Sequence, residues 1–350
     1  MKRVEGHARV ERLIHEAIEA FELDLTGITV LTEAASGAFV VTPLIAARAG
    51  AFVVAVTRDS RYGTANDVVE YATDWATRLG VRDSIAFHVG SSRDRAPDAQ
   101  LITNLGFVRP IDEAFLSSAQ SGAVVSLMCE PWEARRTDVD VLACRAAGVP
   151  VLGTDEHDPR LRTFHFVGVL ALRLLLELEI EVLLGTIVVI SSEPFATPIV
   201  ETLRSLGADV TLVDVTADGD LASRRIVDVC RRADAIVVAE HRDRRVLIGG
   251  DTGLPVDLLD AAGTAVVHIA GAVEDPERRL RKLPAGESEP GIMTVTTDLV
   301  GPRPVIGLHT AGLRVGQLLV EGMRRLGDAA AAEAAALRES PALAVEVATA

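Results

Sequence analysis

Short apolar runs rich in valine and isoleucine alternate with helical patterns along most of the chain. The predicted strands form two sets, separated by a long apolar stretch at 163–184. A strand–helix–strand alternation produces parallel sheets with helices on both faces. The chain is therefore predicted to be an α/β protein with two parallel-sheet domains. The predicted strands are 28–31, 52–56, 84–89, 101–103, 123–127 and 149–152, then 186–190, 209–213, 235–238, 265–269, 293–296 and 305–308.

The domain organisation follows from the length of 350 residues, which suits two cores of roughly 150 residues each. Residues 1–162 are expected to form a substrate domain, completed by a C-terminal helix within 310–330, and residues 163–309 a nucleotide-binding domain. The long helices at 163–184 and 310–330 are expected to join the domains, which would face each other across a cleft. The alanine-rich tail at 331–350 is expected to be a frayed helix or disordered.

The apolar stretch at 163–184 is long enough to be a membrane span, but it contains an arginine and three glutamates (Arg173, Glu177, Glu179 and Glu181). Such side chains cost roughly 2.5–3.5 kcal/mol each at a bilayer centre, so a buried helix is predicted. No signal-peptide pattern is present at 1–25, and a cytoplasmic location is predicted.

The charge of the chain disfavours nucleic-acid binding, and its cysteines disfavour a disulfide framework or a zinc site. The net charge is −15 and no basic stripe is visible, which disfavours nucleic acid as a partner. The three cysteines, Cys129, Cys144 and Cys230, form no CxxC pair and are expected to be reduced core thiols.

Two segments carry similar motifs. A Thr-Pro pair, Thr42-Pro43 in the first half and Thr197-Pro198 in the second, follows a strand and opens a helix, and a Gly-Ala pair then precedes the next strand. A proline costs little in the first turn of a helix, because its missing N–H would be unbonded there. The halves are therefore predicted to be distant structural copies.

Further motifs resemble a known family. Residues 108–116, 124–128 and 137–152 resemble the substrate domain of D-2-hydroxyacid dehydrogenases, and 305–312 resembles the segment with that family's catalytic histidine. S-adenosylhomocysteine hydrolase shares this architecture. The likeness spans roughly 100–325, with degenerate motifs, and implies two Rossmann-like domains of the formate/glycerate dehydrogenase type. It also implies an NAD(P)-dependent oxidoreductase that acts on a small polar, carboxylate-bearing metabolite. The enzyme would be a homodimer with a role in biosynthesis. NAD is the expected cofactor; NADP or no cofactor remains open.

Three positions depart from the family. The segment 191–196 has no glycine where G-x-G-x-x-G would let the backbone approach a pyrophosphate, and its glutamate would repel one. The segment 270–272 replaces the expected catalytic arginine. The glutamate that would pair with His309 is missing, and Asp298 is the nearest carboxylate.

Candidate site residues follow from the rule that ligands of open α/β sheets bind beyond the carboxyl ends of the strands. His309 is expected to end the last strand of the second domain and to point into the cleft as an acid/base. Arginines can clamp a carboxylate or a phosphate, although each could instead pair with a neighbouring acid. Asp214 ends a strand where an acid accepts a ribose hydroxyl, or where it only caps the strand end. The candidates are His309 and His268 for catalysis; Arg58, Arg109, Glu130, Trp132 and Arg135 for substrate; and Ser191, Ser192, Thr197, Asp214, Glu240 and His241 for the cofactor, with no metal ligand.

Two other functions remain open. The missing glycines favour a binding or scaffold protein that kept the fold and lost catalysis, whereas the polar residues at the strand ends favour an enzyme. A non-redox transferase with two facing domains is the third alternative.

Overall fold

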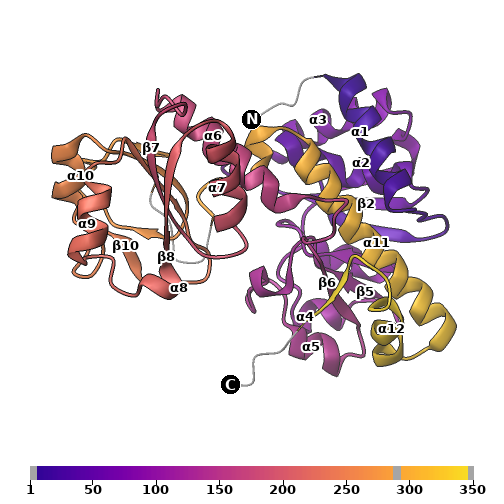
Figure 1. Cartoon of the computed structure of the whole chain (residues 1–350). Coiled ribbons are helices and arrows are strands. Elements are labelled where there is room, and N and C mark those ends of the chain that lie inside the picture. Colours follow the sequence, from indigo (N-terminus) through magenta and orange to yellow (C-terminus); the bar gives the residue numbers. More distant parts are fainter. Residues whose placement is uncertain (1–5, 287–292, 346–350) are drawn as a thin grey trace. The chain divides into compact units, whose positions relative to one another are not determined.

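The computed structural model describes residues 6–286 and 293–345, which form two compact units (Figure 1). Unit 1 contains the described residues up to Leu161 and from Pro302 onward. Unit 2 is the continuous segment Arg162–Gly301. The first unit is thus built from both ends of the chain, and the second is inserted into it.

Unit 1 is built on a seven-stranded sheet with the order β14-β6-β5-β4-β1-β2-β3. All neighbouring strands are parallel except β14, which pairs antiparallel with β6. Nearly every residue of the four central strands is buried, as expected for a parallel sheet covered on both faces. The strands are β1 (Thr29–Glu33), β2 (Phe52–Thr57), β3 (Ile85–Val89), β4 (Leu101–Thr103), β5 (Val124–Ser126), β6 (Val151–Thr154) and β14 (Ala342–Ala344).

The longest helix of unit 1, α11 (Arg303–Leu326), packs on the sheet, with α12 (Ala329–Ala336) folded back beside it (Figure 1). Two glycines allow the close approach: a Cβ at Gly312 would lie 2.5 Å from the Sδ atom of Met128, and one at Gly316 would clash with Leu101 of β4. The other helices of unit 1 are α1 (His7–Ala20), α2 (Val41–Arg48), α3 (Ala65–Arg78), α4 (Glu113–Leu116) and α5 (Val141–Ala146), with short 3-10 turns at η1 (Gly37–Val40), η2 (Arg82–Ser84), η3 (Ser92–Asp98) and η4 (Pro131–Glu133).

Unit 2 has a parallel five-stranded sheet with the order β13-β11-β9-β7-β8 and a separate two-stranded ladder. The sheet strands are β7 (Thr186–Ser191), β8 (Asp209–Asp214), β9 (Ala235–Ala239), β11 (Ala265–Ala270) and β13 (Lys282–Leu283); the ladder is β10 (Val246–Ile248) and β12 (Ala272–Val273). The helices are α6 (Thr163–Glu177), α7 (Ala196–Ser205), α8 (Val215–Asp218), α9 (Arg224–Cys230) and α10 (Val256–Ala262), with a 3-10 turn at η5 (Thr297–Val300).

The α/β class with two parallel sheets is confirmed, but several predicted elements are wrong. Residues 305–308 lie in α11, which begins at Arg303, seven residues before the range 310–330 predicted for the C-terminal helix, because a short apolar run does not distinguish a strand from a buried helix. Residues 293–296 contain only a single bridge, from Met293 to Ala270. The long helix ends at Glu177 instead of 184. The tail, expected to be a frayed helix or disordered, contains the helix α12 and, in its described part, the edge strand β14, which was not predicted.

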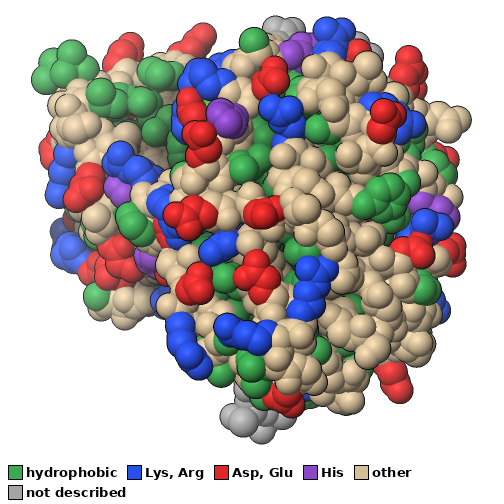
Figure 2. All heavy atoms as spheres, turned by 90° about the vertical axis from the view of Figure 1, so that its right-hand side faces the viewer, with side chains coloured by type: hydrophobic (Ala, Val, Ile, Leu, Met, Phe, Trp, Pro, Cys, Tyr) green, Lys and Arg blue, Asp and Glu red, His purple; other side chains and the backbone are tan. Residues whose placement is uncertain are grey.

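None of the helices in the described part of the chain is long and apolar enough to cross a membrane. On the molecular face that Figure 2 shows, acidic and basic side chains are interspersed. This face therefore lacks the basic stripe that nucleic-acid-binding proteins carry.

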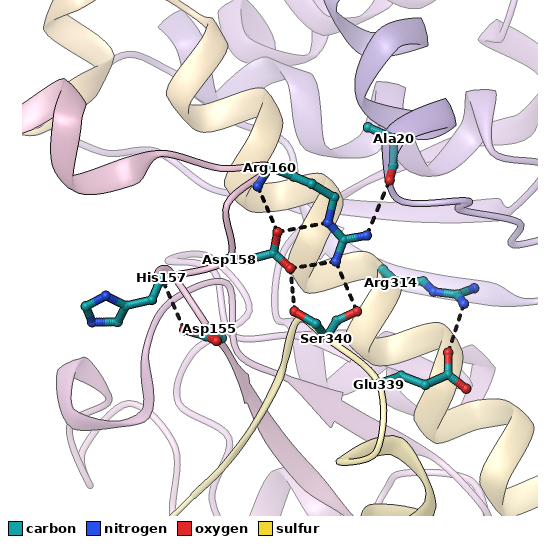
Figure 3. A network of polar contacts seen from close by, with 8 residues as sticks. All are labelled: Ala20, Asp155, His157, Asp158, Arg160, Arg314, Glu339 and Ser340. Carbon is teal, nitrogen blue, oxygen red and sulfur yellow. Dashed lines mark hydrogen bonds and ion pairs between the residues drawn. The ribbon is translucent and has the colours of Figure 1, made fainter.

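A polar network in unit 1 joins three segments that lie far apart in the sequence (Figure 3). The carboxylate of Asp158 accepts hydrogen bonds from Nε and Nη2 of Arg160, at 2.8 and 2.5 Å, and from the hydroxyl of Ser340. The same guanidinium donates to the carbonyl oxygens of Ala20, at 3.3 Å, and Ser340, at 3.1 Å. The network thus ties the end of α1 and the segment before β14 to the chain leaving β6.

Candidate functional site

Each sheet has one point where the order of its strands reverses. In unit 1 the chain builds β1, β2 and β3 to one side and then continues with β4 on the other side of β1. In unit 2, β8 and β9 flank β7 in the same way. At each of these points the loops after two neighbouring strands, β1 and β4 in unit 1 and β7 and β9 in unit 2, lead to opposite sides. Ligands of open α/β sheets bind there. The Thr-Pro pairs occupy the second and third residues of the helices that follow, α2 and α7.

At the reversal point of unit 2, the register places Ser191 between Ala239 of β9 and Asp214 of β8. The hydroxyl of Ser191 donates to the carbonyl of Ala239 at 2.6 Å, which fixes the ends of β7 and β9 together. The next residues on these strands, Ser192 and Glu240, are 4% and 0% exposed. Four predicted cofactor residues therefore lie side by side in this structure.

Glu240 and Ser192 carry polar atoms without a hydrogen-bond partner among the described residues. Oε1 of Glu240 accepts from the backbone N–H groups of Arg242 and Asp243, at 2.7 and 2.9 Å. Its Oε2 atom and the Oγ atom of Ser192 have no partner in the described part of the chain. Buried polar atoms in folded proteins nearly always have a partner, so this pair points to a ligand or to ordered water.

Aromatic rings from α6, from the start of α7 and from the loop after β9 pack against one another. The ring of Phe195 lies 4.5 Å from the ring of His241 and 6.0 Å from that of Phe164, measured between centroids. Burial lowers the pKa of His241 to about 4, although the nearby carboxylate of Glu240 acts in the opposite direction. His241 is therefore neutral at pH 7 and presents an apolar face to Phe195.

A carboxylate lies at the beginning of α7. The hydroxyl of Thr197 donates to Oε1 of Glu193 at 2.5 Å. The N–H groups of Phe195 and Ala196 both donate to the carbonyl oxygen of Ser192, at 3.2 and 3.1 Å. Two prolines, at 194 and 198, contribute no N–H group. Few donors therefore remain for an external anion.

Asp214, at the end of β8, caps the short helix that follows. Its Oδ1 atom accepts hydrogen bonds from the backbone N–H and the hydroxyl of Thr216, at 2.9 and 2.7 Å. These bonds lower the pKa of Asp214. The carboxylate is partly exposed, so it can accept a further hydrogen bond at the edge of the site.

His268 lies within β11 and is fully buried. Its Nε2 atom lies 2.8 Å from the carbonyl oxygen of Gly271 and so carries the proton that it donates. Burial lowers the pKa of His268 to about 4, and a backbone partner already engages its ring.

At the reversal point of unit 1, the carboxylate of Glu33 is buried and accepts from the backbone N–H of Phe107 at 3.2 Å. Burial raises the pKa of Glu33. The backbone N–H groups of Phe107 and Gly106 and the charges of Arg109 and Arg58 lower it, but burial outweighs them. Arg58 donates to the carbonyl of Phe107 at 3.3 Å and lies over its ring, 5.3 Å from the centroid. The rule that ligands bind beyond the carboxyl ends of the strands also selects Glu33, because it is the last residue of the central strand β1.

The remaining predicted arginines of unit 1 converge on one acid. Arg109 donates to Asp138 at 2.8 Å and also to the carbonyl of Asn104. Arg135 lies 3.4 Å from the same carboxylate. Both arginines therefore have an internal anion as partner, whereas the exposed Arg58 forms no ion pair among the described residues.

A second group of predicted residues surrounds Glu130, which follows β5. Its carboxylate accepts from Nε1 of Trp132 at 2.5 Å and lies 3.9 Å from Nε2 of His157. Glu133 and Glu156 adjoin it. Burial raises the pKa of the Glu156 carboxyl, and repulsion from Glu133 and Glu130 adds to this effect. In the described residues, no group of three or more His, Cys, Asp or Glu side chains is arranged to hold a metal ion.

The cysteines have the properties of core thiols. Burial raises the pKa of each of Cys129, Cys144 and Cys230 to about 12. All three therefore remain protonated at neutral pH, and a thiolate nucleophile is not formed.

His309 lies in the interior of α11, and the exposed position at the end of a strand that was expected for it is wrong. The side chain is 3% exposed, and its Nδ1 atom lies 2.5 Å from Oγ1 of Thr42 on α2. Its ring lies 5.9 Å from that of Phe39. Burial lowers the pKa of His309 to about 4, so the imidazole is neutral at pH 7.

Comparisons with known proteins gave matches only among solved structures. No protein-family model matches the chain, and no curated protein matches it. A dipicolinate synthase chain from Bacillus halodurans is similar at 10% identity, with 85% of this chain and 98% of that chain covered and a TM-score of 0.48. The NAD+-bound 3-phosphoglycerate dehydrogenase from Entamoeba histolytica is similar at 11% identity, over 86% and 97% of the two chains, with a TM-score of 0.45. A 2-hydroxyacid dehydrogenase from Ketogulonicigenium vulgare is similar at 14% identity, over 87% and 96%, with a TM-score of 0.45. Two of these three proteins are named dehydrogenases, the kind of protein that the sequence motifs resemble.

Proposed function

We propose that the chain binds small polar metabolites on an oxidoreductase-like fold, and that its nucleotide-binding unit has diverged from standard dinucleotide chemistry. The observation that carries this proposal is the pair of buried polar atoms at the reversal point of unit 2, Oε2 of Glu240 and Oγ of Ser192, that have no hydrogen-bond partner among the described residues. A buried carboxylate oxygen without a partner costs about 1–3 kcal/mol or more, and a bound donor group recovers that cost.

A dinucleotide fits this site only in part. Asp214 can accept a ribose hydroxyl, because one of its oxygens is engaged by Thr216 and the side chain is partly exposed. The diphosphate does not fit the beginning of α7, since Glu193 lies there and the N–H groups of Phe195 and Ala196 are already bonded. No catalytic step is therefore assigned to a nicotinamide cofactor.

The second candidate is the NAD(P)-dependent oxidoreductase implied by the family resemblance, acting on a small carboxylate-bearing metabolite. Asp214 favours it, because an acid at the end of the second strand selects NAD over NADP through the ribose 2′-hydroxyl. In this candidate, Arg58 would hold the substrate carboxylate in unit 1, beside the Glu33 carboxyl with its raised pKa. A homodimer and a cytoplasmic location belong to the same proposal; light scattering of the purified chain tests the first.

Calorimetric titration with NADH and NADPH separates the two candidates. The divergent protein binds neither cofactor in the micromolar range. The oxidoreductase binds NADH more tightly than NADPH, and Asp214→Ala reduces that preference. An Asp209→Ala variant, which removes an exposed carboxylate at the opposite end of the same strand, serves as the matched control.

A further inference from the structure

The carboxyl end of β7 is surrounded by acceptors. Glu193 lies at the beginning of α7, Asp214 ends the neighbouring strand on one side, and Glu240 follows the neighbouring strand on the other. The three carboxylates come from three different segments. The site therefore offers oxygen acceptors and negative charge to any ligand that enters it.

The N-terminus of the helix that would bind an anion here, α7, already has a carboxylate beside it. Backbone N–H groups at a helix N-terminus and the helix dipole attract phosphate. In α7 no side chain caps the helix N–H groups, but the carboxylate of Glu193 lies beside this end of the helix, where the Thr197 hydroxyl donates to it at 2.5 Å. Two of the first N–H groups donate to the carbonyl of Ser192, and Pro198 removes another. A phosphate would meet a like charge and few donors.

The unpartnered atoms show which ligand chemistry is missing. Oε2 of Glu240 is fully buried, and Ser192 is only 4% exposed. Oε1 of Glu240 is occupied by two backbone N–H groups, so the carboxylate is held in place with one oxygen left over. A ligand that satisfies this oxygen must donate a hydrogen bond.

We propose that the site formed by Ser192, Glu240 and Asp214 binds a small ligand that donates hydrogen bonds and carries no phosphate. Its chemistry is that of a vicinal diol or an ammonium group, because both donate to carboxylate oxygens and neither adds negative charge. This inference rests on the proposed function, namely that unit 2 binds a small polar ligand, and it names the class of that ligand.

Calorimetry on the full chain with four probes tests the proposal. Adenosine supplies a neutral diol, putrescine supplies ammonium groups, ADP adds a diphosphate to the same nucleoside, and NADH is the complete dinucleotide. We expect adenosine or putrescine to bind, and ADP to bind at least ten-fold more weakly than adenosine. If ADP or NADH binds as tightly as adenosine, the inference on ligand class fails while the oxidoreductase candidate gains. If none of the four binds, the assignment of a ligand site to unit 2 fails as well.

Variants assign the effects to residues. Glu240→Gln removes the charge of the buried acceptor and should weaken the bound probe at least ten-fold; Ser192→Ala tests the same site if Glu240→Gln does not fold. Glu193→Gln should strengthen ADP binding roughly two- to five-fold, through the helix dipole, and leave the neutral or cationic probe unchanged. Glu201→Gln, on an exposed position of the same helix, is the matched charge control and should change neither. An equal effect of Glu193→Gln and Glu201→Gln on ADP would overturn the role given to Glu193.

Discussion

Oγ1 of Thr42 and Nδ1 of His309 lie 2.5 Å apart, although 267 residues separate them in the sequence. Both side chains are buried, so removing either partner leaves a polar atom without a hydrogen bond. We expect Thr42→Val and His309→Leu each to lower the free energy of unfolding by about 1–3 kcal/mol, with the double variant less destabilised than the sum. Chemical denaturation followed by tryptophan fluorescence measures this in unit 1, which contains both tryptophans, Trp75 and Trp132. Additive effects would show that the two side chains do not interact.

The catalytic role of His309 stays a prediction, and the same variants bear on it. His309→Gln keeps a polar partner for Thr42 and removes the imidazole. Loss of turnover by about 10²–10⁴-fold at unchanged stability would support acid/base catalysis. Stability and turnover that fall together would instead assign His309 to the core.

Buried histidines should make the protein sensitive to mild acid. Burial lowers the pKa of His241, His268 and His309 to about 4, below the usual value near 6.5. The unfolded chain therefore binds more protons than the folded one between these values, so stability falls as the pH drops from about 6.5 to about 4. His309 alone would contribute on the order of 3 kcal/mol to this loss. Fluorescence-detected unfolding of unit 1 across this pH range should show a smaller slope for His309→Gln, and an unchanged slope would contradict the lowered pKa.

A second loss of stability is expected at lower pH, from Asp158. Burial alone would raise the pKa of this carboxyl, but the hydrogen bonds from Arg160 and Ser340 outweigh it and lower the pKa to about 2. The folded state therefore gains stability from Asp158 above the unfolded pKa near 3.9 and loses it as the pH falls toward 2. Asp158→Asn should remove this component in acid denaturation, whereas Asp83→Asn, at an exposed aspartate of the same unit, should not. Identical acid transitions in the two variants would argue against the network of Figure 3.

The close packing of α11 on the sheet predicts a steric effect. A Cβ at Gly316 would clash with the fully buried Leu101, so Gly316→Ala should cost about 1–3 kcal/mol despite the higher helix propensity of alanine. Gly307→Ala on the same helix is the control, since its Cβ would meet only the end of the Leu161 side chain, at 3.3 Å. Thermal unfolding of the two variants compares them directly. A Gly316→Ala protein as stable as Gly307→Ala would show that helix and sheet are less tightly packed.

Much of the fold could be predicted from the sequence because its parallel strands are apolar runs between turn residues. The edges of β4, Leu101–Thr103, were predicted without error, and those of β7 and β8 were correct to one residue. The segment 305–308 was wrong because Val305, Ile306 and Leu308 suit a buried helix as well as a strand. The choice depends on packing against the distant Leu161 and Met128, which local pattern does not contain.

The candidate site was predictable only where chain topology brings residues together. Ser191, Ser192, Glu240 and His241 converge because two neighbouring parallel strands end at the same edge. That Glu33 is held by the loop after β4 and that Arg109 and Arg135 share Asp138 depend on loop conformations. Motif spacing carries no information on such loops.

The insertion of unit 2 into unit 1 has a consequence for protein synthesis. When a ribosome has translated the chain as far as Gly301, all of unit 2 has been made, whereas unit 1 still lacks α11, α12 and β14. The apolar face of the β4–β5–β6 region that α11 covers stays open during this interval. Nascent chains stalled between Gly301 and the end of the chain should therefore recruit chaperones through unit 1, while unit 2 can already resist protease.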